Sequence, residues 1–249
     1  MTTKKIIACL DIKDGSVVKG INFVDINEVG NPVEFAKRYE QEGADELVLL
    51  DITATNENRG TVLELVAEVA NEISIPFTVG GGIHSVYEAQ AVIVAGADKV
   101  SVGSAAIKSP ELITQLSNKL GKDRVVLAID CKLDNNEWLV YTQGGKKATD
   151  LLALDWAMEG ERLGAGSILL TSMNNDGAKN GFATDITKAI ADAVNIPVVA
   201  SGGAGTQEHF LELFQQTSAE SGLAASVFHY KEINIGKLKE YLRENEINI

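Results

Sequence analysis

Two aspartates stand at the ends of two similar apolar segments, Ile6–Asp11 and Val125–Asp130. Each segment has the composition of a buried β-strand, so each carboxyl group is expected where a strand ends and a loop begins. Two carboxyl groups can perform general acid–base catalysis when their surroundings push their pKa values apart. A single aspartate at a strand end can equally cap its loop by accepting backbone N–H groups. Because Asp11 and Asp130 occupy equivalent places, we predict that they form a catalytic pair.

The similarity between the two halves extends along most of the chain. Segments repeat at offsets of 119 to 122 residues, in the same order in both halves. The repeated segments are Gly43–Leu50 and Gly164–Thr171, Ile75–Gly82 and Ile196–Gly203, and Ser101–Ser104 and Leu223–Ser226. We interpret the chain as two duplicated half-barrels, about residues 1–121 and 122–249. Duplicated polar loops predict a ligand with two similar ends.

Strand and helix patterns predict the architecture that positions these residues. Eight short β-like runs begin near Lys5, Glu46, Pro76, Lys99, Val125, Ser167, Pro197 and Gly222. Most of these runs are followed by an amphipathic stretch of helical period. This alternation is typical of a (β/α)8 TIM barrel of the α/β class, which commonly contains about 250 residues. We therefore expect residues 1–249 to form one barrel domain.

Local signals refine the expected barrel. Asn31-Pro32 and Ser109-Pro110 each place a potential capping side chain just before a proline, which predicts two helix starts. Residues 132–145 include an alternating stretch that predicts a small hairpin extension after the fifth strand. A long loop is expected after the first strand, and both insertions should lie on the same face of the barrel.

Two glycine-rich turns could bind phosphate groups. Gly80–Gly82 follows the third strand, and Ser201–Gly205 follows the seventh. Glycine lets a phosphate approach the backbone closely, and a helix N-terminus supplies free N–H donors. Ser104 and Ser226, after the fourth and eighth strands, add a hydroxyl group beside each turn, so we predict two phosphate sites. The candidate binding residues are Lys19, Asp51, Gly82, Gly103, Ser104, Asp176, Gly177, Gly202, Gly203, Ala225 and Ser226.

Two of these candidates have plain structural alternatives. Lys19 belongs to the long first loop, which could simply be a charged loop in solvent. Asp51 ends the second strand and could either hold Lys19 or cap its own loop. Both are kept as binding candidates, since Lys19 could lie close to a phosphate-bearing substrate.

Three charged residues are predicted at the opposite end of the barrel. Alternate side chains of a strand point to opposite faces, so an inward Asp11 places Lys5 on the inner face at the N-terminal end. Glu46 and Lys99 start the second and fourth strands in the same orientation. An unpaired buried charge is costly, so these residues are expected to form a salt-bridged plug or a gate.

The composition argues against several classes of function. The net charge of −13 opposes nonspecific binding to nucleic acids, which depends on Lys and Arg. No apolar run approaches the roughly 20 residues of a membrane span. The N-terminus leads into a strand without the features of a secretory signal, so a cytoplasmic location is expected. The two cysteines and three histidines show no zinc-type spacing, and we expect no metal site.

Motifs spread along nearly the whole chain resemble the cyclase subunit of imidazole glycerol phosphate synthase. The motifs are Ala8–Gly15, Leu50–Ala54, Phe77–Ile83, Leu170–Met173, Asp176-Gly177 and Ala200–Gly203. The resemblance implies an enzyme of histidine biosynthesis that combines ammonia with a bisphosphorylated ribulosyl-formimino aminoimidazole carboxamide ribotide. Its products would be imidazole glycerol phosphate and aminoimidazole carboxamide ribotide. The resemblance also implies that Asp11 and Asp130 are the acid–base pair, that a glutaminase subunit docks at the barrel floor, and that no cofactor is needed.

The chain departs from the family pattern at two positions. Lys5, Glu46 and Lys99 match the family's charged ring around the ammonia entrance, whereas Ser167 stands where a glutamate is usual. Two positive charges would then face one negative charge. We therefore expect the lysines to be held apart or to recruit a solvent anion. Gly103 stands where an asparagine near the first phosphate is common.

Two other functions are considered. The sister isomerase of the same pathway is also a two-phosphate barrel with an aspartate pair, but an isomerase that uses no ammonia has no need of a charged floor. A non-catalytic barrel could bind phosphate or the glutaminase without turnover. The presence of both Asp11 and Asp130 disfavours this second alternative.

Overall fold

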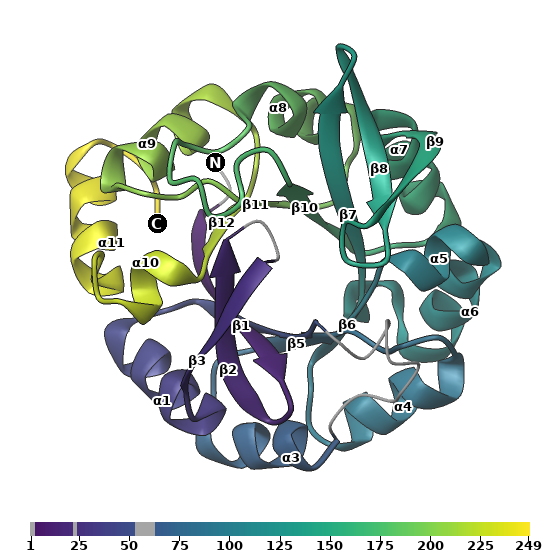
Figure 1. Ribbon diagram of the computed structural model, residues 1–249, viewed down its shortest axis with the longest axis horizontal. Helices are drawn as coiled ribbons and strands as arrows, with labels where there is room; N and C mark the ends of the chain where they lie inside the picture. Colours follow the sequence, from purple (N-terminus) through teal and green to yellow (C-terminus); the bar gives the residue numbers. More distant parts are fainter. Residues whose placement is uncertain (1–2, 22–23, 53–62) are drawn as a thin grey trace.

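The computed structural model describes residues 3–21, 24–52 and 63–249. Within these residues, parallel strands form a closed barrel in the order β10-β11-β12-β1-β4-β5-β6-β7, and β7 pairs with β10 to close it (Figure 1). The strands are β1 (Lys5–Lys13), β4 (Glu46–Asp51), β5 (Phe77–Gly80), β6 (Lys99–Val102), β7 (Val125–Asp134), β10 (Ser167–Ser172), β11 (Val198–Ser201) and β12 (Ser221–Ala224). The predicted (β/α)8 fold is confirmed, and every strand begins within one residue of its predicted start.

Helices surround the barrel on its outer side (Figure 1). The helices of the described residues are α1 (Pro32–Glu42), α3 (Leu63–Glu72), α4 (Val86–Val94), α5 (Ser104–Lys108), α6 (Glu111–Leu120), α7 (Ala153–Leu163), α8 (Thr184–Ala193), α9 (Gln207–Gln216), α10 (Ser226–His229) and α11 (Ile235–Glu244), with a short 3-10 turn at Lys122–Arg124. Across the described ranges, no helix is long and apolar enough to cross a membrane.

Most of the barrel strands contribute side chains to two apolar cores. In β1, Ile6, Ala8 and Leu10 pack into the outer core beneath the helices, whereas Ile7 and Cys9 point into the barrel interior. The interior cluster also contains Val48, Val126, Leu169 and Leu223. Burial of apolar surface, worth about 25 cal/mol per Å², favours this alternation on both faces of the sheet. The predicted direction of the β1 side chains is confirmed, which places Lys5 and Asp11 at opposite ends of the interior.

The two predicted helix caps differ in outcome. The side chain of Asn31 accepts hydrogen bonds from the backbone N–H groups of Val33 and Glu34 at the start of α1, so this cap is confirmed. The prediction for Ser109 is wrong. Ser109 ends α5, and α6 follows from Pro110 without a side-chain cap hydrogen bond. The backbone carbonyl of Ser109, instead of its hydroxyl group, accepts a hydrogen bond from Leu112.

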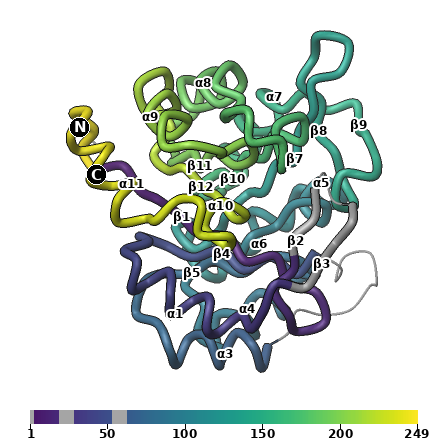
Figure 2. Tube along the Cα trace, turned by 60° about the vertical axis from the view of Figure 1, so that its left-hand side comes forward, coloured from purple at the N-terminus to yellow at the C-terminus, as the bar shows by residue number. Residues whose placement is uncertain are grey.

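Antiparallel extensions follow the first strand of each half. The predicted hairpin after the fifth strand is present, as β7 continues to Asp134 and pairs with β8 (Glu137–Thr142), and a third strand, β9 (Lys147–Leu152), lengthens it. The long first loop is instead formed by β2 (Ser16–Ile21) and β3 (Val24–Gly30), which pair in the same manner. Both extensions lie away from the chain termini (Figure 2). The repeat thus includes the extensions as well as the barrel.

Candidate active site

A cavity of about 280 Å³ opens at the C-terminal ends of the barrel strands. Both predicted catalytic residues, Asp11 and Asp130, line it. Nine of the predicted binding residues also line it, namely Asp51, Gly103, Ser104, Asp176, Gly177, Gly202, Gly203, Ala225 and Ser226. Gly82 is not in the lining, and its neighbour Gly81 takes that place. Lys19 lies in β2 opposite Asn27, but its side chain falls outside the described residues.

Asp11 and Asp130 lie on opposite sides of this cavity. They belong to β1 and β7, which are separated by three strands in either direction around the ring. The thiol sulfur of Cys9 lies 3.7 Å from Oδ1 of Asp11. Burial and the neighbouring charge of Asp176 raise the pKa of Asp130 to about 6. Asp130 can therefore hold a proton close to neutral pH, as a general acid must.

The two glycine turns repeat each other in backbone geometry. Gly81 has a φ of 91°, and a Cβ atom there would lie 2.1 Å from the carbonyl oxygen of Asp51. Gly202, 121 residues later, has a φ of 88°, and its Cβ would lie 2.7 Å from the carbonyl oxygen of Ser172. Only glycine accepts this combination of positive φ and close approach. Each turn therefore presses against the end of the preceding strand and exposes its backbone to the cavity.

The helices after β6 and β12 also repeat. Gly103 precedes α5 with φ −123° and ψ −94°, and Ala225 precedes α10 with φ −123° and ψ −75°. Ser104 and Ser226 are the first residues of these helices, where backbone N–H groups have no partner within the helix. The cavity thus has two similar polar ends, each made from a glycine turn and the start of a short helix.

The turn between β8 and β9 contributes residues that sequence reasoning missed. Gly144 and Lys146 line the cavity, and the backbone N–H of Gln143 donates a 2.9 Å hydrogen bond to Oγ of Ser104. The Gln143–Lys146 segment therefore reaches over the Ser104 end of the site. A possible signal in the sequence was Gly144-Gly145-Lys146, where the predicted hairpin of residues 132–145 ends. The position of this turn over the site, however, depends on a contact between residues 39 apart in the sequence.

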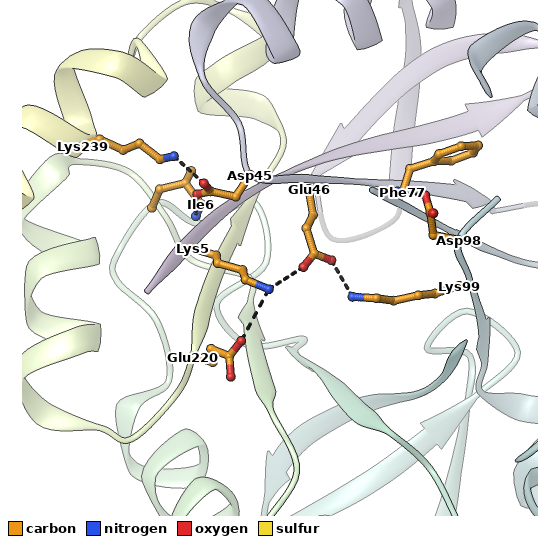
Figure 3. A network of polar contacts seen from close by, with 9 residues as sticks. All are labelled: Lys5, Ile6, Asp45, Glu46, Phe77, Asp98, Lys99, Glu220 and Lys239. Atoms are coloured by element: carbon orange, nitrogen blue, oxygen red, sulfur yellow. Dashed lines mark hydrogen bonds and ion pairs between the residues drawn. The ribbon is translucent and has the colours of Figure 1, made fainter. Parts of the chain in front are cut away.

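At the opposite end of the barrel, Lys5, Glu46 and Lys99 form an ion-pair network (Figure 3). Nζ of Lys5 lies 2.8 Å from Oε1 of Glu46, and Nζ of Lys99 lies 2.7 Å from Oε2. Burial opposes the ionisation of Glu46, but hydrogen bonds from both lysines outweigh it and hold the pKa of this carboxyl below its ordinary value. Burial lowers the pKa of Lys5, but its contacts with Glu46 and Glu220 outweigh burial and raise this pKa above its ordinary value.

Of the two expected alternatives, that the lysines are held apart or recruit a solvent anion, the first is wrong. Both converge on Glu46, and Glu220, just before β12, places a second carboxylate oxygen 3.6 Å from Nζ of Lys5 (Figure 3). Glu220 therefore gives Lys5 a second carboxylate partner, and it also acts electrostatically on Lys4. Ser167 starts β10 beside Val126 and contributes no charge. Glu220 was missed because it directly precedes its strand, outside the inward positions that strand parity identifies.

Two further carboxylates in the same view support the strand starts. Asp45 accepts the backbone N–H of Ile6 at 2.8 Å, and Asp98 accepts that of Phe77 at 2.9 Å (Figure 3). Lys239 of α11 lies 2.6 Å from Asp45. These bonds join the N-terminal ends of neighbouring strands. Asp45 and Asp98 therefore have a structural role.

The described residues include no group of three or more His, Cys, Asp or Glu side chains placed to hold a metal ion. Cys9 and Cys131 are both buried, unbridged thiols. Burial raises the pKa of the Cys131 thiol, and the charges of Asp130 and Asp185 act in the same direction. Cys131 therefore stays in its protonated, weakly nucleophilic form.

Comparison with known proteins identifies the family. The family model described as histidine biosynthesis protein matches residues 5–234. The chain is 52% identical over 251 residues to the imidazole glycerol phosphate synthase subunit HisF of Geobacillus thermodenitrificans, with 100% of both chains covered. It is 55% identical to the subunit of the same name from Thermococcus gammatolerans, covering 100% of this chain and 98% of the relative. The chain therefore belongs to the histidine biosynthesis family and, within it, to the HisF subunits of imidazole glycerol phosphate synthase.

Proposed function

We propose that this chain performs the cyclase reaction of imidazole glycerol phosphate synthase. The reaction combines ammonia with the bisphosphorylated ribulosyl substrate and yields imidazole glycerol phosphate and aminoimidazole carboxamide ribotide. One observation carries the proposal: Asp11 and Asp130 face a single cavity whose two polar ends repeat each other. A substrate with a phosphate at each end and a reactive centre between them matches this arrangement.

The two aspartates act as the acid–base pair. Asp130, whose pKa lies near 6, supplies the proton that a leaving group or developing negative charge requires. Asp11, across the cavity, accepts the proton released when ammonia adds to the substrate. Each carboxyl group then returns to its starting state through exchange with substrate or water. No metal or organic cofactor is required for these proton transfers.

The phosphates bind at the two repeated ends. Backbone N–H groups near Gly82, Gly103 and Ser104 hold one phosphate, and those near Gly177, Gly203 and Ser226 hold the other. These donors must offset the repulsion between a phosphate and the carboxylates of Asp11, Asp51, Asp130 and Asp176 in the cavity lining. Asp51, Asp176, Gly202, Ala225 and Lys19 complete the binding residues in this proposal.

Ammonia enters through the network of Lys5, Glu46, Lys99 and Ser167, from a glutaminase subunit docked at the N-terminal face. The support is the position of this network below an interior of apolar side chains, including Ile7 and Val48. Such an interior favours neutral ammonia over the ammonium ion, because burying an isolated charge is costly. The reaction is expected in the cytoplasm and involves neither nucleic acid nor membrane.

A direct assay tests the proposed function. Purified protein is incubated with the ribulosyl substrate and an ammonium salt, and imidazole glycerol phosphate is measured. Formation of this product supports the proposal. Conversion of the preceding pathway intermediate without ammonia would assign the isomerase reaction instead, and binding without turnover would assign a non-catalytic role.

A further inference from the structure

The active-site cavity carries an uneven distribution of charge. Among the lining residues that the structure describes, four are aspartates, one is a lysine and none is an arginine. The aspartates are Asp11, Asp51, Asp130 and Asp176, and the lysine is Lys146. A phosphorylated ligand carries strong negative charge at neutral pH, so its entry into this lining needs a compensating cation.

Lys146 has the position and freedom to supply that charge. Lys146 lines the cavity, and no ion pair or side-chain hydrogen bond joins its ammonium group to any residue in the described ranges. Its backbone N–H donates to the carbonyl of Thr142 at 3.1 Å, which closes the turn between β8 and β9. The ammonium group is therefore anchored by a defined backbone but is not committed to a neighbouring carboxylate.

The turn between β8 and β9 also determines which end of the cavity Lys146 lies near. The hydrogen bond of 2.9 Å from Gln143 to Ser104 fastens the turn to the Ser104 end. Gly103 precedes Ser104 and has no side chain to fill the space at this end of the cavity. A Cβ atom built on Gly103 would lie 3.4 Å or more from the nearest atoms, which belong to Ala128. An ammonium group from the turn can thus approach an anion at this end.

We propose that Lys146 binds the phosphate group held at the Gly103–Ser104 end of the cavity. Lys146 supplies the cation, and the backbone around Ser104 supplies the remaining donors. This assignment rests on the proposed function for the identity of the substrate, but the phosphate contact itself can be measured without turnover. It also makes the two ends unequal, because the turn from which Lys146 extends is attached to only one of them.

Phosphate titration monitored by NMR tests the contact. The backbone amide of Ser104 reports on one end, and that of Ser226 reports on the other within the same molecule. Lys147 provides the matched control, since it is the next residue, is exposed, and does not line the cavity. With inorganic phosphate as the probe, Lys146→Gln should weaken binding at Ser104 by about tenfold, a typical effect of losing one charge-assisted hydrogen bond. Binding at Ser226 should stay within about twofold.

The controls separate this proposal from the function of the enzyme. Lys147→Gln removes the same net charge and should leave both reporters unchanged, whereas Lys146→Arg should retain most of the affinity. Equal affinities at Ser104 in the Lys146→Gln and Lys147→Gln proteins, or no phosphate binding at Ser104 in the unmodified protein, would overturn the proposal. In an active enzyme, Lys146→Gln should raise the KM for the ribulosyl substrate by about tenfold and change kcat much less. Absence of cyclase activity would refute the proposed function without altering the NMR result.

Discussion

The carboxylate of Glu220 lies 3.6 Å from the ammonium group of Lys5 at the N-terminal end of the barrel. Glu46 lies closer, at 2.8 Å, and also binds Lys99. The side chain of Glu46 is 9% exposed and that of Glu220 is 21% exposed. Lys5 therefore has two carboxylate partners, and Glu46 forms the shorter and less exposed contact.

This difference predicts unequal effects on stability. Glu46→Gln leaves two partly buried lysines without their shared carboxylate and should lower the free energy of unfolding by about 2 kcal/mol at pH 7. Glu220→Gln removes a longer, more solvated contact and should lower it by less than about 1 kcal/mol. Urea denaturation of both variants measures these values. An equal or larger loss in Glu220→Gln would show that Glu220 is the main partner of Lys5.

The gate hypothesis predicts a selective change in activity. Ser167→Glu adds a carboxylate at the start of β10 and should alter glutamine-dependent cyclisation with the glutaminase subunit more than cyclisation with added ammonium. Added ammonium can reach the cavity directly from its open upper face. Ser167→Gln, similar in size but uncharged, is the control. Equal effects on both activities, or none on either, would leave the floor as a structural salt-bridge plug.

Replacement of either aspartate should abolish most of the turnover. Asp11→Asn and Asp130→Asn are each expected to lower kcat for ammonia-dependent cyclisation by about 10²- to 10⁴-fold, the usual contribution of one acid–base group. The KM for the ribulosyl substrate should stay within about an order of magnitude, since the phosphates supply most of the binding. Steady-state kinetics with ammonium salt decides this, and near-normal turnover in either variant would refute the assignment.

The raised pKa of Asp130 predicts a pH-dependent gain in stability on its removal. An aspartate in the unfolded chain titrates near 3.9, whereas Asp130 titrates near 6 in the fold. Ionised Asp130 therefore destabilises the folded state above about pH 6, and this cost fades as the pH falls towards 4. Asp130→Asn should raise the free energy of unfolding by about 1–3 kcal/mol at pH 8 and by less than about 0.5 kcal/mol at pH 4.

Asp150→Asn is the control for this experiment, because Asp150 is exposed on β9 and carries the same charge. Denaturation curves of both variants at the two pH values give the comparison. A gain in Asp130→Asn that does not depend on pH, or one that Asp150→Asn reproduces, would contradict the electrostatic explanation.

The glycine turn after β5 predicts a sharp contrast between two alanine substitutions. Gly81→Ala places a Cβ atom 2.1 Å from the carbonyl oxygen of Asp51 at a φ of 91°, and should cost about 3 kcal/mol or more. Gly103→Ala places its Cβ atom 3.4 Å from the nearest atom, in a backbone conformation that Ala225 adopts in the other half. It should change stability by less than about 1 kcal/mol. Similar losses in thermal denaturation would refute the steric argument.

The sequence alone determined the barrel and the place of its aspartate pair. Strands in a closed parallel barrel are buried on both faces, so they appear as apolar runs, and the repeat of these runs in two halves identified equivalent positions. Asp11 and Asp130 could be predicted at one cavity because parallel strands all end at the same face. The single-domain organisation and the half-barrel boundary near residues 121 and 122 remain predictions of the same kind.

Tertiary structure alone decided the features that depend on contacts between distant segments. The pairing of Glu220 with Lys5 spans 215 positions, and no local pattern marks it, because Glu220 precedes its strand. The attachment of the β8–β9 turn to Ser104 likewise depends on the twist and register of the extension, which brought Lys146 into the cavity. The periodicity of apolar residues in a sequence indicates which face of a helix or strand is buried. The partner of a polar side chain is determined only when the helices and strands pack together.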